Sequence, residues 1–297
     1  MHVALVMNAR LPVHGYGGSE RVVAWLARGL QELGHAVTLI ASTGTRMPGI
    51  AVAEADHRAL QQRDFDVSAL LPPGVDIVHS HRRLWVAPPV PFVWTLHGNP
   101  PPGTVLPDNT IFLSANHAVR YGHRRFVYNG LDLSEYRYQA NKADYDLFLG
   151  RLHSVKGYRL AIEGARRAGR RLIVAGGWRP SLRRGLSYAG RVGGERKAAL
   201  LAGARCLWMP ALWDEPFGLT LIEALASGTP VIGTRRGALP EIVTAEVGVL
   251  GDTLDELVEG ASRVAKIDPA SCRARVERLF THRVMAENYV REYSLAL

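Results

Sequence analysis

Residues 214–232 read DEPFGLTLIEALASGTPVI and decide how the second half of the chain folds. Pro216 suits the edge of a helix, and residues 217–226 carry helix-forming and core-facing side chains. Residues 227–230, SGTP, end the helix before a strand at residues 231–232. The helix is therefore expected to begin near Gly218.

Two carboxylates and a set of amides surround the start of this helix. The amides of Gly218, Leu219 and Thr220 have no partner within the helix, and such a helix start binds anions. Glu223 lies more than one turn inside, where it can accept two hydrogen bonds from a ribose diol, whereas Glu215 can reach toward a sugar. Along a helix their carboxylates would be about 12 Å apart, too far for the roughly 5 Å of a retaining glycosidase pair. The alternative is that both glutamates are solvated charges.

Size and composition indicate a globular chain of two domains. The 297 residues are 47% hydrophobic and 21% charged, enough for two medium domains that each bury a core. No apolar run approaches the ~20 residues of a membrane span, and the start, MHVALVM, reads as a buried strand rather than a leader. An integral membrane protein is therefore excluded. Cys206 and Cys272 are expected to be free thiols of a reducing cytoplasm.

The net charge of +9 is unevenly distributed. Between Arg151 and Arg205 there are fourteen Lys or Arg against two acidic residues, an excess of twelve, so the remainder is slightly acidic. This basic region could attract a diphosphate, an anionic acceptor or an anionic membrane at the inner surface. Without a recognisable recognition module, nucleic-acid binding is not supported.

Short apolar runs alternate with helical segments along the whole chain. Such alternation predicts α/β domains, each with a parallel sheet covered by helices on both faces. The expected strands are residues 3–6, 37–41, 76–79, 92–96, 111–113 and 126–128, and then 146–149, 171–175, 206–209 and 231–232. We expect two doubly wound domains at 1–138 and 139–282, and a closing helix at 283–297 that packs back on the first. Ligands of such sheets bind at the carboxyl ends of the strands, so the cleft between the domains is the expected site.

A glycine-rich loop at residues 14–21, HGYGGSER, follows the first strand and enters a helix. Gly17 and Gly18 could cradle a phosphate on backbone amides. The loop fits a dinucleotide fingerprint only loosely, because Glu20 stands in place of the third glycine. An NAD oxidoreductase is therefore a weak alternative.

Three other residues lie just past expected strands. Arg151 and Lys156 share a loop at residues 150–157, and two cations there suit a leaving diphosphate. His97 precedes a glycine-proline loop and could act as a hydrogen-bond donor or acceptor in the cleft. His79 and His81 would share one face of a strand, but no third ligand follows, so no metal site is expected.

Together these motifs resemble glycosyltransferase family 4, a family of retaining enzymes with the GT-B fold, over nearly the whole chain. Residues 16–23, YGGSERVV, are similar to its glycine loop, and residues 128–132, YNGLD, to the segment before its linker. The loop at 150–157 is similar to its donor-phosphate loop. Glu215 and Glu223 match its E-x7-E motif, which is the most specific signal.

The resemblance implies a role for each matched residue. Arg151 and Lys156 would neutralise the leaving diphosphate, Glu215 would hold the donor sugar, and His97 would face the reacting centre. The donor would also contact residues of the glycine loop, of the base-reading segment and of the helix start: Gly17, Gly18, Tyr188, Gly190, Arg191, Val192, Phe217, Gly218, Leu219, Thr220 and Glu223.

The implied reaction transfers a hexose from a nucleoside diphosphate sugar with retention at the anomeric carbon. It implies no cofactor and no metal, because cations and helix amides supply the electrostatic stabilisation. The stretches YGGSER and WDEPFGLT resemble those of family members that use UDP-sugars, and this likeness favours UDP-glucose as the donor. GDP-mannose is the alternative. From a different class, the chain could be a noncatalytic binder of an anionic polymer or membrane surface.

One feature departs from the family pattern. The first domain is short, with little room for helices between Ser42 and Asp76. Of the functions that the resemblance implies, acceptor recognition is the one that this short domain leaves least defined. The sequence does not identify the acceptor.

Overall fold

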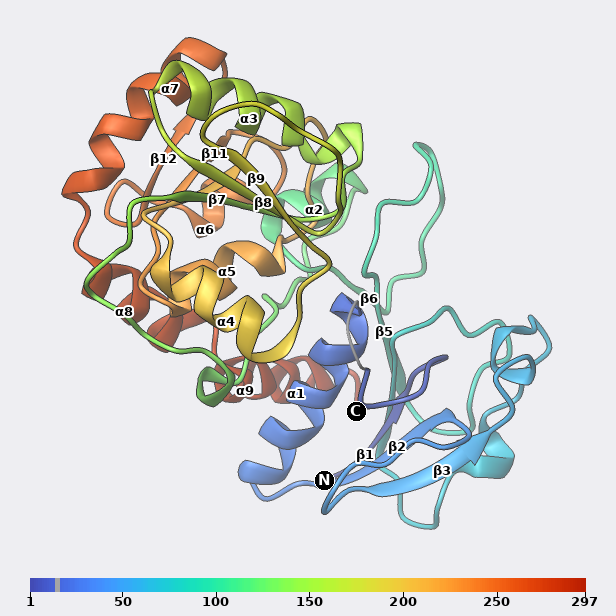
Figure 1. Cartoon of the computed structure of the whole chain (residues 1–297). Coiled ribbons are helices and arrows are strands. Elements are labelled where there is room, and N and C mark those ends of the chain that lie inside the picture. The colour runs from blue at the N-terminus through green and yellow to red at the C-terminus, as the bar shows by residue number, and fades with distance from the viewer. Residues whose placement is uncertain (14–16) are drawn as a thin grey trace. The chain divides into compact units, whose positions relative to one another are not determined.

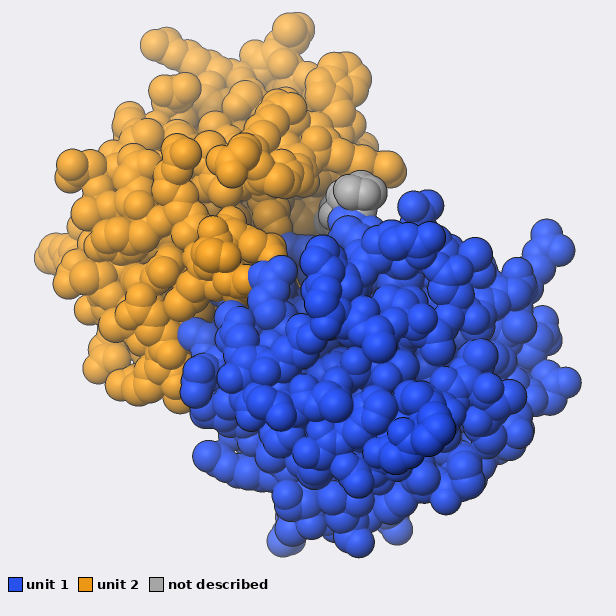
Figure 2. Space-filling view, turned by 90° about the horizontal axis from the view of Figure 1, so that it is seen from below, with its two compact units in different colours: residues 1–131, 280–297 blue, residues 132–279 orange. Residues whose placement is uncertain are grey.

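The computed structural model describes residues 1–13 and 17–297 of a chain that forms two compact units (Figure 1, Figure 2). Unit 1 comprises Met1–Leu131 and Phe280–Leu297, and unit 2 comprises Asp132–Leu279. Within the described ranges, no helix is both long and apolar enough to cross a membrane.

The unit boundaries differ from the expected positions after residues 138 and 282. Leu131 pairs with the returning chain in unit 1, since its amide donates to Phe280 O and its carbonyl accepts from the His282 amide, both at 2.9 Å. Tyr136 instead donates its hydroxyl to Glu223 in unit 2. The chain therefore leaves unit 1 at Leu131 and re-enters it at Phe280.

Unit 1 contains a six-stranded parallel sheet in the order β3-β2-β1-β4-β5-β6. Its strands are β1 (His2–Val6), β2 (Ala36–Ser42), β3 (Ala51–Ala55), β4 (Ile77–Ser80), β5 (Phe92–Thr95) and β6 (Thr110–Ile111). Its helices are α1 (Gly18–Glu32), α2 (Ala115–Arg120) and α9 (His282–Ser294), with short 3-10 turns η1 (Ala59–Gln61) and η2 (Ser68–Leu70). The expected strand at 126–128 is wrong, because only Phe126 forms a bridge, to Phe112. The short connection after β2 holds β3, η1 and η2.

The carboxyl-terminal helix α9 packs in unit 1 against α1. Gly29 of α1 permits close approach, since a Cβ atom there would lie 2.6 Å from His282 O. Tyr289 and Tyr293 are fully buried. The Tyr293 hydroxyl is 2.7 Å from His79 Nδ1, and the Tyr289 hydroxyl is 2.9 Å from Thr95 Oγ1. These polar contacts fix α9 on the sheet of unit 1.

The buried histidines of unit 1 predict an acid-sensitive fold. Burial lowers the pKa of His79 to about 3 and that of His117 to about 4. Below pH 6.5 the unfolded chain gains protons at these residues while the folded chain does not, so stability falls as the pH falls. Each residue should contribute up to about 1.4 kcal/mol per pH unit between roughly pH 6.5 and 4. Urea unfolding of the full chain at pH 7, 6 and 5 measures how the free energy of unfolding changes with pH.

The variant His117→Asn should lose its share of that slope. An unfolding free energy that stays constant between pH 7 and 5 would contradict the burial of these neutral imidazoles. A slope of the opposite sign would contradict it as well.

Unit 2 repeats the same topology with the order β12-β11-β10-β7-β8-β9. Its strands are β7 (Asp146–Leu149), β8 (Leu172–Ala175), β9 (Leu186–Gly190), β10 (Leu207–Met209), β11 (Val231–Thr234) and β12 (Gly248–Gly251). Its α-helices are α3 (Tyr158–Arg167), α4 (Gly194–Gly203), α5 (Leu219–Ala226), α6 (Leu239–Ile242), α7 (Leu254–Arg263) and α8 (Pro269–Leu279). Its 3-10 turns are η3 (Leu133–Glu135), η4 (Ser154–Lys156) and η5 (Val264–Lys266). Both sheets reverse their strand order once, and the carboxyl edge at such a reversal is where doubly wound sheets bind ligands.

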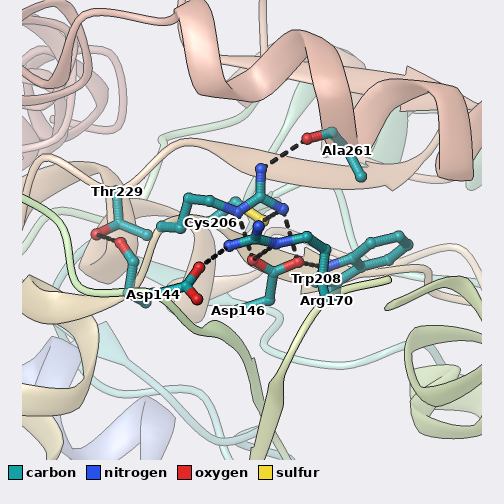
Figure 3. Close-up of polar contacts among 9 residues, drawn as sticks. Asp144, Asp146, Arg170, Cys206, Trp208, Thr229 and Ala261 are labelled. Carbon is teal, nitrogen blue, oxygen red and sulfur yellow. Dashed lines mark hydrogen bonds and ion pairs between the residues drawn. The ribbon is translucent and has the colours of Figure 1, made fainter. Parts of the chain in front are cut away.

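A buried ion pair stabilises the centre of unit 2 (Figure 3). The fully buried Asp146 accepts from Arg205 Nε and Nη2 and from Trp208 Nε1, each at 2.8 Å. Asp144 lies outside this core and pairs with Arg170. The Asp146 carboxylate is therefore enclosed by side chains of β10 and of the turn before it.

Candidate functional site

Helix α5 begins at Leu219, one residue after Gly218, as the sequence predicts. Gly218 has φ +93°, a left-handed conformation that favours glycine, and its carbonyl accepts from the Leu221 amide at 2.9 Å. Thr220 and Leu219 form the first turn and are partly exposed. The Phe217 side chain is 1% exposed and belongs to the core, so only its backbone remains for a ligand.

The carboxylate of Glu215 is held by two donors. It is 2.6 Å from Lys156 Nζ and 2.9 Å from Trp213 Nε1, and the ammonium group also lies 4.6 Å from the centre of the Trp213 ring. Glu215 is 8% exposed. The structure thus brings together Lys156 and Glu215, which were expected to contact different parts of a ligand.

Glu223 is also buried, at 1% exposure, on the inner face of α5. Its Oε1 accepts from the Tyr136 hydroxyl at 2.8 Å and from Lys197 Nζ at 2.9 Å. The alternative that both glutamates are solvated is therefore wrong. The sequence reasoning missed Tyr136 and Lys197. Lys197 gave no local signal, because its contact with Glu223 depends on the packing of α4 beside α5.

The Arg151 to Lys156 loop is fixed against the segment before Trp213. Gly157 has φ +72°, and a Cβ atom there would lie 1.8 Å from Pro210 O. The Leu212 amide donates to Val155 O at 2.8 Å. This packing directs Lys156 to Glu215, while Arg151 is exposed.

Replacement of Gly157 by alanine should displace this loop. The clash with a backbone carbonyl adds to the left-handed φ, so we expect Gly157→Ala to lose Lys156-dependent nucleotide binding. Gly169→Ala is the matched control, because Gly169 has φ +66° and a Cβ atom added there would meet no other atom within 4 Å. The control should cost only about 1 kcal/mol of stability. Equal effects of the two variants on nucleotide affinity would contradict the role of the close packing.

The expected base-reading segment continues β9 at the carboxyl edge of the sheet. Tyr188 is half-buried, and burial raises its pKa. Gly190 has φ +71°, and its carbonyl accepts from the Gly176 amide at 2.7 Å. Arg191 is exposed and Val192 is half-buried. These residues belong to unit 2, as do Glu215 and Glu223.

Unit 1 carries the remaining predicted residues. Residues 14–16 of the glycine loop lie outside the described residues, whereas Gly17 precedes α1 and Gly18 begins it. His97 is half-buried beyond β5, and its Nε2 is 2.9 Å from His81 Nδ1. Burial lowers the pKa of His97 to about 4, so its ring is neutral at pH 7. Among the described residues, no group of three His, Cys, Asp or Glu is placed to hold a metal ion.

Known proteins share both the sequence and the fold. The chain is 34% identical over 114 residues to the MMP alpha-(1->4)-mannosyltransferase of Mycolicibacterium hassiacum, a match that covers 35% of this chain and 27% of that protein. It is 40% identical over 81 residues to a GDP-mannose-dependent alpha-(1-6)-phosphatidylinositol dimannoside mannosyltransferase of Mycobacterium tuberculosis, covering 27% and 21%. The matches thus span about a quarter of these curated relatives.

A solved structure resembles the chain over its whole length. The fold of AviGT4, a glycosyltransferase involved in avilamycin A biosynthesis, aligns with a TM-score of 0.79 and 29% identity, covering 99% of this chain and 97% of that one. Two family models match successive segments, Glycosyltransferase Family 4 at residues 16–145 and Glycosyl transferases group 1 at residues 144–267. With the two six-stranded doubly wound sheets, these matches show that the chain belongs to glycosyltransferase family 4 and has the GT-B fold.

Proposed function

We propose that the chain transfers a hexose from a nucleoside diphosphate sugar to an acceptor, with retention and without a metal. The observation that carries the proposal is the buried Glu215–Lys156 pair beside the amino-terminal turn of α5. A carboxylate for sugar hydroxyls and a cation for phosphate thus stand next to helix amides.

The proposed chemistry uses charge already present in unit 2. Lys156 would turn from Glu215 toward the leaving diphosphate, and the exposed Arg151 would add a second cation. The first amides of α5, at Leu219 and Thr220, would bind phosphate oxygens. Stabilisation of the developing charge by these fixed groups is what a metal supplies in other transferases.

Glu223 is proposed to bind the ribose. Because Tyr136 and Lys197 already donate to its Oε1, the carboxylate is held in one orientation before a nucleotide arrives. The fixed carboxylate would accept hydrogen bonds from the ribose diol without first being ordered, which lowers the cost of binding.

For the donor we propose GDP-mannose first and UDP-glucose second. The motif wording favours the reverse order, but the two curated relatives above are named as mannosyltransferases, one of them GDP-mannose-dependent. His97, Gly17 and Gly18 are proposed to contact the donor from unit 1. A neutral His97 would act through hydrogen bonds rather than through charge.

The test is a transfer assay in EDTA with labelled GDP-mannose, UDP-glucose and ADP-glucose. The acceptors are a panel of oligosaccharides, glycolipids and inositol phosphates. We expect one donor to release its nucleoside diphosphate and label one acceptor class with the anomeric configuration retained. No release from any donor, or a strict need for a divalent cation, would overturn the proposal. Nucleotide binding without transfer to any acceptor would favour a noncatalytic protein.

A further inference from the structure

The connection between β8 and β9 differs from its neighbours in unit 2. Residues 176–185 join these two parallel strands without a helix (Figure 1). Parallel strands are usually joined by a crossover of a dozen or more residues that carries a helix. The other connections in this sheet contain α3, α4, α5 and α6. The helix that would cover this part of the sheet is replaced by a ten-residue loop.

The loop exposes large apolar side chains. Trp178 is 69% exposed and Leu182 is fully exposed. Arg179, Pro180 and Ser181 separate them, and the Arg183 amide donates to Ser181 Oγ. Neither side chain packs in the core of unit 2, although removing each from water would be energetically favourable.

The same loop lies in a region without negative charge. Residues 164–194 contain eight arginines and no Asp or Glu. Arg179, Arg183 and Arg184 are exposed on the loop, and Arg171 is exposed beside Gly185, where β8 pairs with β9. Across residues 1–13 and 17–297, none of these four arginines forms an ion pair. Three other arginines of the region do form ion pairs, Arg166 and Arg167 with Glu163 and Arg170 with Asp144.

We propose that residues 178–184, together with Arg171, dock this protein on a membrane surface rich in anionic phospholipid. Trp178 and Leu182 would enter the interface, and the arginines would bind lipid phosphates. A soluble polyanion would use the arginines but would leave both apolar side chains in water. A protein partner would need a shaped surface, whereas this loop presents two isolated apolar side chains among charges. The proposal goes beyond sugar transfer and does not depend on it.

Vesicle flotation tests the proposal, with the full chain and no donor present. Vesicles of phosphatidylglycerol and phosphatidylcholine should bind the protein, and pure phosphatidylcholine should not. Each arginine near an anionic surface should contribute about five-fold to partitioning, so Arg183→Ser with Arg184→Ser should weaken it roughly 25-fold. Trp178→Ser with Leu182→Ser should also reduce binding at least ten-fold, even in high salt, where the charge contribution is weakened.

A matched control separates position from charge. Arg263 and Arg278 are exposed on α7 and α8 of the same unit, and replacing both by serine removes the same charge. This control should keep wild-type vesicle binding.

Three results would overturn the proposal: equal loss in the control, equal binding to neutral vesicles, or unchanged binding in both loop variants. Nucleoside diphosphate binding is measured for every variant. Its selective loss in the loop variants, with vesicle binding unchanged, would assign the loop to the donor site instead. A failure of the transfer assay leaves the vesicle result intact, so the two proposals can fail separately.

Discussion

Glu215→Gln is expected to lower kcat about 100- to 1,000-fold while leaving KM for the donor within a few-fold. Glutamine keeps the size of the side chain and an oxygen for Lys156 and Trp213, but it removes the negative charge that we propose lies beside the reacting sugar. The effect should therefore appear in turnover rather than in binding. The measurement is steady-state release of nucleoside diphosphate from the donor identified by the transfer assay.

Two further variants make this result interpretable. Glu259→Gln removes an exposed carboxylate on α7 and should leave the kinetics unchanged. Glu223→Gln should raise KM more than it lowers kcat, because its proposed partner is the ribose. Wild-type kinetics in both Glu215→Gln and Glu223→Gln would contradict the assignment of these two residues to the donor site.

Asp146→Asn is expected to destabilise unit 2 by about 3–5 kcal/mol. The substitution leaves the Arg205 guanidinium without its buried counter-charge, and the side chain of Arg205 is only 14% exposed. Trp208 Nε1 also loses a charged acceptor. Urea unfolding at pH 7, followed by tryptophan fluorescence, gives the change in the free energy of unfolding.

Asp144→Asn is the matched control for that variant. Asp144 also pairs with an arginine, but its side chain is 75% exposed, so the loss should be below about 1 kcal/mol. Similar losses in the two variants would show that burial does not determine the strength of these pairs. A stability loss below about 1 kcal/mol in Asp146→Asn would contradict the structural role of the network.

The sequence predicted most of the fold because short buried strands and glycine stops are local signals. Helix α5 begins at Leu219 as expected, and the alternation of strands and helices correctly predicted two parallel sheets. Strand β3 was missed because AVAEA contains alanine and glutamate, which have low strand propensity, and its pairing with β2 decides its structure. The error at residues 126–128 has a similar cause, since an apolar run does not specify a strand partner.

The sequence named the candidate site residues but did not predict the contacts among them. The sequence placed Glu215 before a helix start and Lys156 past a strand end, and their ion pair depends on how the loop around Gly157 packs on Pro210. Lys197 was counted only as part of a basic region. Its contact with Glu223 depends on the packing of α4 beside α5, which no local pattern specifies.

The central claim is that Lys156 and its neighbours form a metal-independent site for a nucleoside diphosphate. Titration calorimetry in EDTA with GDP, UDP and ADP tests it most directly, using wild type, Lys156→Met and the exposed-lysine control Lys266→Met. We predict that one diphosphate binds wild type and the control alike, and binds Lys156→Met at least ten-fold more weakly. Failure of all three nucleotides to bind wild type, or equal binding to Lys156→Met, would contradict the claim.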